Sequence, residues 1–288
     1  MLGAQRSADR VSLEELEAIV RSAGKAVMDV YAGAFAVERK LDGSPVTEAD
    51  RRAEEIILDG LERLTPGTPI VSEEKIDLAS DGGEPAGWRR EDRVFWLVDP
   101  LDGTKEFVSR NGEFTINVAL VEEGIPAVGV VFAPALRRLF AAAARRGAIV
   151  DDLAGRRPVA ARVAPAEGAT VVSSRSHGNA DALERFTSGR RIAAQVTAGS
   201  SLKFCLVAAG QADIYPRFGR TMEWDTAAGD AVLRAAGGRV TDLEGRELRY
   251  GKPGFENPQF VAWGRDSEAG AARGAARRGG ARDLGPSD

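Results

Sequence analysis

The segment that most constrains this chain is residues 94–107, where an apolar run ends in a turn that carries two carboxylates. Val94–Val98 is apolar throughout, and the sequence Asp-Pro-Leu-Asp-Gly-Thr follows it directly. Such a run, bounded by turn residues, predicts a core strand, and α/β proteins hold ligands just beyond strand ends. The carboxylates suit a hard cation, and Gly103 and Thr104 suit a phosphate. An ordinary turn is the alternative, because Asp-Pro and Asp-Gly are common turn dipeptides.

Composition narrows the class of protein. The chain has 288 residues and 43% hydrophobic content, which allows one large core or two smaller ones. A net charge of −4 provides no general surface for nucleic acid or membrane. The single cysteine, Cys205, excludes an intrachain disulfide, and with one histidine it excludes a His/Cys zinc site, so a metal here needs oxygen ligands. Without an apolar run that could span a bilayer or serve as a signal peptide, we expect a cytoplasmic protein.

The sequence predicts that residues 1–162 form an α+β half of the protein. Ser12-Leu13-Glu14-Glu15 is a capping box that opens an amphipathic helix, and a second helix is expected from Thr47 to Thr65. A short strand, Pro69–Ser72, comes before a polar, Gly-rich loop over residues 77–93. After the Asp-Pro-Leu-Asp-Gly-Thr turn, residues 114–162 predict an antiparallel meander of strands.

Residues 163–265 predict an α/β half, because strand and helix patterns alternate there. Helices are expected near residues 180–186, 201–209 and 225–236, and strands between and after them. Residues 266–288 are rich in Gly, Ala and Arg, with hardly any large apolar side chain, and this composition predicts a disordered tail.

Further acidic residues stand at expected element ends. Glu73 follows a predicted strand, and alternation along that strand turns Glu73 to one side and Glu74 to the other. Asp225 opens a predicted helix whose next residues, Ala-Ala-Gly, are small enough for close packing. Each has an ordinary alternative: an exposed acidic pair for the glutamates, and a helix N-cap for Asp225 and for Asp50.

A common location for Glu73, Asp99, Asp102 and Asp225 would require counter-charge. Two carboxylates about 4 Å apart repel by about 4 kcal/mol at an effective dielectric constant near 20. Either their pKa values rise or divalent cations lie between them. Paired carboxylates also serve glycosidases, but those enzymes need no phosphate-binding Gly-Thr beside them.

Three motifs in order, S-E-E, D-P-L-D-G-T and W-D-T-A-A-G, resemble the lithium-sensitive, Mg²⁺-dependent phosphatase superfamily that includes the inositol monophosphatases. The resemblance covers Val11–Trp263. Within the superfamily, G-T-K-E-F at 103–107, G-S-S-L-K-F-C at 199–205 and I-Y-P-R at 214–217 are similar to the CysQ-type 3′(2′),5′-bisphosphate nucleotidases. The resemblance implies a layered α-β-α-β-α sugar-phosphatase-like fold with mixed sheets. It also implies hydrolysis of adenosine 3′,5′-bisphosphate to AMP and phosphate, beside sulfate assimilation.

The resemblance also implies residue roles. Two Mg²⁺ ions, or three, would be held by Glu73, Asp99, Asp102, Asp225 and the backbone carbonyl of Leu101. Glu73 and Thr104 would orient the attacking water, with Asp50 supporting Thr104 or a further ion. The substrate, a small phosphorylated nucleotide, would contact a larger set: Glu73, Leu101, Asp102, Gly103, Thr104, Ser174, His177, Ser200, Lys203, Arg217 and Asp225.

Alternatives remain open at the substrate side. The alternative to a substrate contact is a solvated loop histidine for His177, an exposed helix lysine for Lys203 and a surface charge for Arg217. A broad inositol- or sugar-phosphate phosphatase would use the same metal chemistry. A sensor or scaffold that binds the nucleotide without turnover is a rival of another class. The sequence carries no expectation for the oligomeric state.

Overall fold

The computed structural model describes residues 7–39, 45–75, 93–175 and 180–266. Its helical segments are α1 (Ser7–Arg10), α2 (Leu13–Tyr31), α3 (Glu48–Leu64), η1 (Glu73–Lys75), α4 (Thr104–Val108), α5 (Ala180–Thr187), α6 (Leu202–Ala208), α7 (Ala227–Ala235) and η2 (Pro253–Phe255). Its strands are β1 (Glu38–Arg39), β2 (Pro45–Val46), β3 (Ile70–Ser72), β4 (Val94–Asp102), β5 (Thr115–Glu122), β6 (Ile125–Ala133), β7 (Arg138–Ala143), β8 (Gly147–Asp152), β9 (Gly155–Val159), β10 (Ala169–Ser174), β11 (Ile192–Ala198), β12 (Ile214–Arg217), β13 (Arg239–Asp242) and β14 (Phe260–Trp263).

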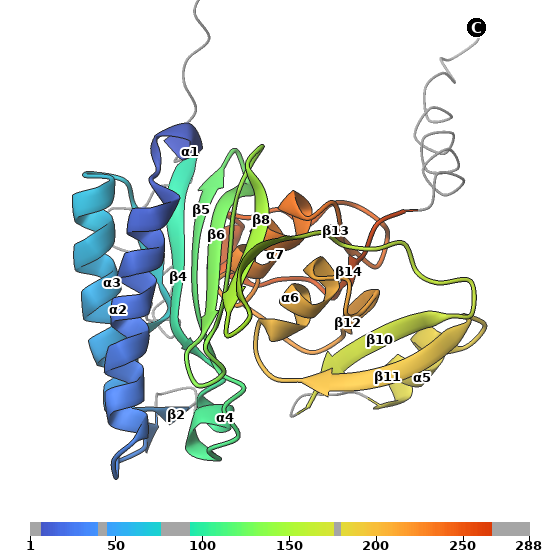
Figure 1. Ribbon diagram of the computed structural model, residues 1–288, viewed down its shortest axis with the longest axis horizontal. Helices are drawn as coiled ribbons and strands as arrows, with labels where there is room; N and C mark the ends of the chain where they lie inside the picture. Colours follow the sequence, from blue (N-terminus) through green and yellow to red (C-terminus); the bar gives the residue numbers. More distant parts are fainter. Residues whose placement is uncertain (1–6, 40–44, 76–92, 176–179, 267–288) are drawn as a thin grey trace, which may run out of the picture.

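These elements form five layers, which are seen edge-on in Figure 1. Helices α2 and α3 form the first layer, the larger sheet the second, α6 and α7 the third, the smaller sheet the fourth, and α5 the last. Both sheets combine parallel and antiparallel pairs. The α-β-α-β-α architecture with mixed sheets is confirmed.

The first-layer helices begin where the sequence predicts. The Ser12 hydroxyl accepts a hydrogen bond of 3.2 Å from the Glu15 amide, and Leu16, Val20 and Val27 of α2 are buried. Thr47 caps α3. Because each helix has one apolar face, both pack on the larger sheet and leave their charged faces to solvent.

The larger sheet has the strand order β3-β4-β5-β6-β7-β8-β9. Strands β3 and β4 are parallel, and each later pair is antiparallel, which confirms the predicted meander. Strand β8 was not predicted, because its apolar run, Ala148–Val150, is too short to signal a strand without its ladder to β7. The expected loop at 77–93 lies mostly outside the described residues.

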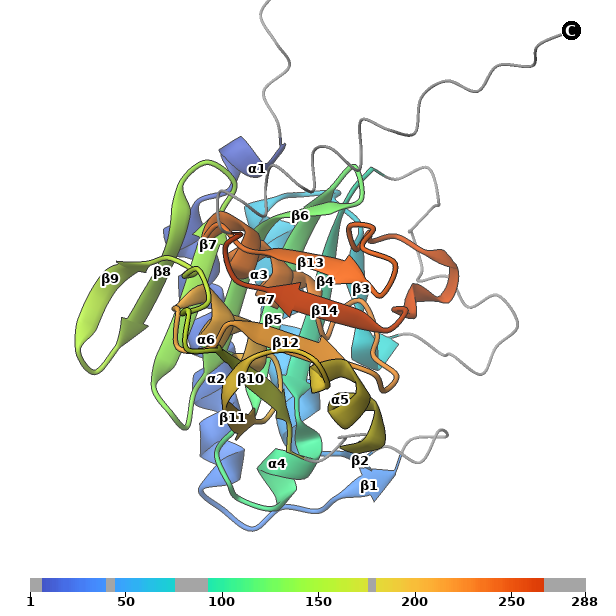
Figure 2. The ribbon, with the colours of Figure 1, turned by 90° about the vertical axis from the view of Figure 1, so that its right-hand side faces the viewer.

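The smaller sheet has the order β11-β10-β12-β14-β13, with β11, β10 and β12 parallel to one another. Helix α5 covers its outer face, where Leu183 and Phe186 pack on Val171 and Ile214 (Figure 2). The alternating strands and helices predicted for residues 163–265 are therefore present.

Helix α7 lies between the two sheets and approaches β6 very closely. A Cβ atom at Gly129 of β6 would lie 2.6 Å from the Cβ of Ala231 and 2.7 Å from the carbonyl oxygen of Ala228. A Cβ at Gly229 would lie 2.6 Å from the Phe204 ring. The small residues of α7 thus allow the close packing that the sequence predicts. One core cluster draws residues from both sides of residue 162, so the division into halves stays a prediction about sequence organisation.

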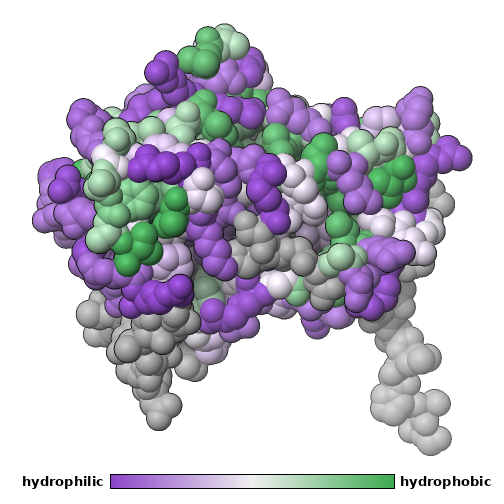
Figure 3. Space-filling model, turned by 90° about the horizontal axis from the view of Figure 1, so that it is seen from below, coloured by the Kyte–Doolittle hydropathy of each residue, from purple (hydrophilic) through white to green (hydrophobic). Residues whose placement is uncertain are grey.

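The surface seen in Figure 3 is mostly hydrophilic, with its hydrophobic side chains in small separate patches. The exposed large hydrophobic residues among the described ones are likewise scattered along the chain, from Val37 to Leu243. Within the described part of the chain, no helix is both long and apolar enough to cross a membrane.

Candidate metal and phosphate site

A β-bulge in β4 brings Asp99 and Asp102 to the same face of the larger sheet. Asp99 pairs with Asn117 of β5, and Asp102 pairs with Thr115, so β4 contains one residue more than β5 between these pairs. Residues three apart on a regular strand point to opposite faces, and the extra residue cancels that alternation. The sequence predicted a turn after Val98, and this expectation was wrong: the ladder to β5 continues the strand to Asp102.

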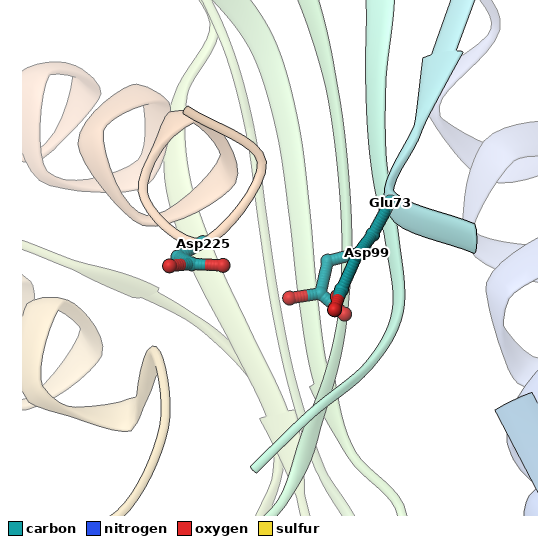
Figure 4. A group of neighbouring side chains, drawn as sticks. All are labelled: Glu73, Asp99 and Asp225. Carbon is teal, nitrogen blue, oxygen red and sulfur yellow. The ribbon is translucent and has the colours of Figure 1, made fainter. Parts of the chain in front are cut away.

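Glu73 reaches the same place from the neighbouring strand. Strands β3 and β4 are parallel, and Ser72 pairs with Val98, so Glu73 and Asp99 follow at the same level. Glu73 opens the short helix η1, and Glu74 beside it is half-buried. Glu73 does face Asp99, as predicted (Figure 4). The reason given for it was wrong, because the two glutamates lie in a short helix and not in an alternating strand.

Asp225 approaches these carboxylates from the third layer, at the start of α7. Oxygen atoms of Glu73, Asp99 and Asp225 lie within 4.8 Å of one another, and Figure 4 shows the three side chains pointing into one gap. Asp225 precedes Thr226, the N-cap of α7, and its Oδ2 accepts a hydrogen bond of 2.8 Å from the Met222 amide. The sequence indicated a position in the first turn of the helix, and this was wrong: Asp225 lies before the helix and does not cap it.

The electrostatics of this group match the requirement for counter-charge. Loss of hydration raises the pKa of the Asp225 carboxyl, and the nearby charges of Asp102 and Glu73 raise it further. A carboxyl whose neighbours are carboxylates gains stability from a proton or from a cation.

Asp102 does not belong to the group of three. Its Oδ2 accepts hydrogen bonds from the hydroxyls of Ser200 at 2.6 Å and Ser201 at 3.1 Å. The Ser201 hydroxyl also donates to the backbone oxygen of Asp225 at 2.6 Å. Hydroxyls of the loop before α6 therefore connect β4 to the start of α7.

The phosphate part of the motif forms the start of the short helix α4. Gly103 is its N-cap with φ of 88°, in the left-handed region that favours glycine. The Thr104 hydroxyl donates to the carbonyl oxygen of Leu101 at 3.3 Å, and the Leu101 amide donates to Asp99 at 3.1 Å. The segment from Asp99 to Thr104 is thus held by its own polar groups.

Asp50 is not the N-cap of α3, the ordinary role that the sequence left open for it, because Thr47 is the N-cap. It is the third residue of α3, and its Oδ2 accepts hydrogen bonds of 2.8 Å from both the amide and the hydroxyl of Thr47. This capping box is a structural role. A further role in supporting Thr104 or a metal ion stays a prediction.

The predicted substrate residues differ in their placement. Lys203 is only 3% exposed, so an exposed helix lysine is excluded; its ammonium donates to the carbonyl of Ala198 at 3.3 Å and to that of Ser200. Burial lowers the pKa of Lys203 to about 8. Ser174 and Arg217 are half-buried at strand ends, and His177 lies outside the described residues.

Two site residues were not predicted. Asn117 on β5 is buried, and its amide donates to the Ser201 hydroxyl at 3.0 Å. Thr115, two residues away, contacts the hydroxyl of Ser200. An asparagine and a threonine beside the apolar run of this strand were the available signal, because buried polar groups require partners.

The donor set suits a hard divalent cation. Carboxylate oxygens come from Glu73, Asp99 and Asp225, and a backbone carbonyl is available at Leu101. Mg²⁺ binds through such oxygen atoms and not through sulfur, and Cys205 is buried with its pKa raised by burial.

The layered fold and the carboxylate group are those expected of a metal-dependent phosphatase, and the comparisons with known proteins show this class. The model of the inositol monophosphatase family matches residues 9–276. The chain belongs to the inositol monophosphatase family.

Particular relatives narrow the similarity. The chain is 47% identical over 253 residues to the 3′(2′),5′-bisphosphate nucleotidase CysQ of Salmonella typhimurium, covering 86% of this chain and 98% of that protein. The CysQ of Escherichia coli strain K12 is 46% identical with the same coverage. The crystal structure of CysQ from Bacteroides thetaiotaomicron, described as a bacterial member of the family, matches with a TM-score of 0.74 and 35% identity. It covers 88% of this chain and 97% of that one.

Proposed function

We propose that this protein is a Mg²⁺-dependent phosphatase that hydrolyses adenosine 3′,5′-bisphosphate to AMP and phosphate. The observation that carries the chemistry is the convergence of Glu73, Asp99 and Asp225 within 4.8 Å of one another. The substrate is supported by relatives of 46% to 47% identity that are named 3′(2′),5′-bisphosphate nucleotidases.

Two Mg²⁺ ions would be held by Glu73, Asp99, Asp102 and Asp225 with the Leu101 carbonyl. A third ion would require a further donor, and Asp50 is the proposed one. When bound, such ions lower the pKa of a water and offset the charge of the phosphoryl and leaving oxygens.

The side chains then orient the reactants. The Thr104 hydroxyl donates to Leu101, so its oxygen is left to accept a hydrogen from the attacking water. Glu73 accepts the proton of that water, and the amides of Gly103 and Thr104 donate to the phosphate that is removed. A covalent phosphoenzyme is not required, and the buried Cys205 thiol, with its raised pKa, is a poor nucleophile.

The retained phosphate would lie toward Arg217. The Nε of Arg217 is buried and has no hydrogen-bond partner among the described residues, while its Nη2 donates to the Arg220 carbonyl at 3.0 Å. A buried donor of this kind gains from an anionic acceptor. Ser174, His177 and Ser200 are proposed as further contacts. Lys203 supplies positive charge behind Ser200, and a direct contact requires that its ammonium exchange its bonds to the two carbonyls.

The deciding experiment measures phosphate release from adenosine 3′,5′-bisphosphate and from inositol 1-phosphate under the same conditions. We expect a higher kcat/KM for the nucleotide, and a preference for the inositol ester would overturn the assignment. Asp99→Asn should abolish release of phosphate from both. If that variant retained the protein's physiological role, the protein would be a nucleotide-binding sensor and not an enzyme. We also propose a cytoplasmic location, which the single cysteine supports.

A further inference from the structure

Glu113 joins its own segment to two others that are distant in the sequence, at Arg175 and at Gly199. It lies between α4 and β5, and its Oε2 accepts hydrogen bonds from the Gly199 amide at 2.8 Å and from the Nε of Arg175 at 3.0 Å. Its Oε1 accepts from the Nη2 of Arg175 at 2.9 Å. This bidentate, charge-assisted pairing fixes a guanidinium more firmly than a single hydrogen bond does.

Each of these segments ends at the proposed substrate site. Arg175 follows Ser174 at the end of β10, and its side chain is 46% exposed. Gly199 opens the loop that carries Ser200 and Ser201, whose hydroxyls hold the Asp102 carboxylate. Glu113 therefore holds the residue that follows Ser174, a proposed substrate contact, and it also holds the loop whose hydroxyls bind Asp102, an expected metal ligand.

The Gly199–Ser201 loop is held in a conformation that needs support. Ser200 has φ of 52°, in the left-handed region, which is costly for a residue other than glycine. A Cβ atom at Gly199 would lie 2.5 Å from the backbone oxygen of Glu113 and 2.8 Å from its Cβ. The carboxylate of Glu113 accepts from the Gly199 amide, and the ammonium of Lys203 donates to the carbonyls of Ala198 and Ser200, so both support this loop.

We propose that Glu113 is a positioning residue that sets the preference for a substrate with a second phosphate. It does so by fixing Arg175 and the Gly199–Ser201 loop relative to each other, and the inference rests on the proposed function. Without Glu113, the exposed Arg175 side chain would regain rotamer freedom, and binding of the second phosphate would include the cost of ordering it again.

The test compares Glu113→Gln with the unaltered protein on two substrates. Glutamine keeps an oxygen for the Gly199 amide and loses the charge that orients Arg175. We expect kcat/KM for adenosine 3′,5′-bisphosphate to fall about tenfold, mainly through KM, because about 1.4 kcal/mol of binding is lost. For inositol 1-phosphate, which has no second phosphate, we expect a change below about twofold.

A matched control is available in the β8–β9 hairpin. Asp152 accepts two hydrogen bonds from Arg157, at 2.7 and 2.8 Å, and one from the Ala154 amide at 2.9 Å. Like Glu113, it accepts two hydrogen bonds from one guanidinium and one from a backbone amide, but the hairpin is at the other edge of the larger sheet from β3. Asp152→Asn should leave the ratio of kcat/KM for the two substrates unchanged.

Arg175→Gln breaks the same ion pair by changing its more exposed partner. It tests the inference if Glu113→Gln fails to fold. We expect it, and the double variant, to lower the ratio at least as far as Glu113→Gln does, because the guanidinium that Glu113 fixes is then absent. Gly199→Ala should instead lower kcat for both substrates, since the displaced loop also holds Asp102. Gly33→Ala is its control, because the nearest atom to a Cβ there is 3.7 Å away.

The possible failures are distinguishable. Equal losses on both substrates, or no loss on either, for Glu113→Gln and Arg175→Gln would overturn the role of Glu113. A preference of the unaltered protein for inositol 1-phosphate would overturn the proposed function before any variant is compared.

Discussion

Glu223 and Asp225 lie on either side of Trp224, and their carboxylates have opposite electrostatic surroundings. Glu223 is fully buried, and its carboxylate accepts hydrogen bonds from the amides of Gly251 and Lys252 at 2.6 and 2.9 Å and from the Lys252 ammonium at 2.6 Å. Asp225 faces Glu73 and Asp99. One carboxylate thus has its counter-ion inside the protein, and the other has further carboxylates.

The direction of each electrostatic effect makes the difference clear. Burial raises the pKa of both carboxyls. At Glu223 the charge and hydrogen bonds of Lys252 oppose that rise, whereas at Asp225 the charges of Asp102 and Glu73 add to it. A buried acid with its own cation becomes costly when one partner is removed, and a buried acid among acids indicates a place for an external cation.

The largest expected effect comes from removing the charge at Asp225. Asp225→Asn should lower kcat by about 10³-fold, which corresponds to about 4 kcal/mol of transition-state stabilisation. The same change should not lower the free energy of unfolding in EDTA, because it removes repulsion. Steady-state kinetics and urea denaturation measure the two quantities. A variant that loses stability without metal would show that Asp225 resembles Glu223 after all.

Glu223→Gln should have the reverse effect. The amide leaves the Lys252 ammonium without its counter-charge, so the free energy of unfolding should fall by about 3 kcal/mol. Binding of Mg²⁺ should persist in the folded fraction, and calorimetric titration with the metal measures it. Unchanged stability would mean that the Lys252 pair contributes little.

Mg²⁺ itself should distinguish the two carboxylates. A ligand at about 100 times its Kd stabilises the state that binds it by about 2.7 kcal/mol. We expect a rise in Tm of this origin for the unaltered protein and for Glu223→Gln. For Asp225→Asn the rise should be small or absent. Thermal denaturation with Mg²⁺ and with EDTA provides the measurement, and Na⁺ at equal ionic strength is the control.

The residues of the carboxylate group can be predicted from the sequence, but their geometry cannot. That Glu73 and Asp99 would meet followed from their positions after strands of one sheet, and the parallel β3–β4 register accounts for it. The β-bulge that aligns Asp99 with Asp102 depends on pairing with Asn117 and Thr115 of β5, which local patterns do not reveal.

Long-range partners also explain what the sequence could not separate. Glu223 and Asp225 look alike in E-W-D, and they differ in partners that are distant in the sequence: the Lys252 ammonium, 29 residues further on, for Glu223, and Glu73 and Asp99 for Asp225. Glu113 was not singled out because its partners, Arg175 and Gly199, are 62 and 86 residues away. Helix starts at Ser12 and Thr47 were predictable, because capping depends on residues within one turn.

Lys203 is a buried cation that can be compared with the two buried carboxylates. Its effect on stability is the smallest that we expect. Its ammonium is bonded to backbone carbonyls rather than to a carboxylate, and burial lowers its pKa to about 8 from 10.5. Because the folded protein releases this proton first, the unfolded chain binds more protons between pH 8 and pH 10.5, and stability rises with pH in that window. Relative to Lys203→Met, the unaltered protein should gain about 2 kcal/mol between pH 8 and pH 10, measured by urea denaturation. Parallel pH profiles for the two proteins would show that the Ala198 and Ser200 carbonyls fully offset the lost hydration of the ammonium.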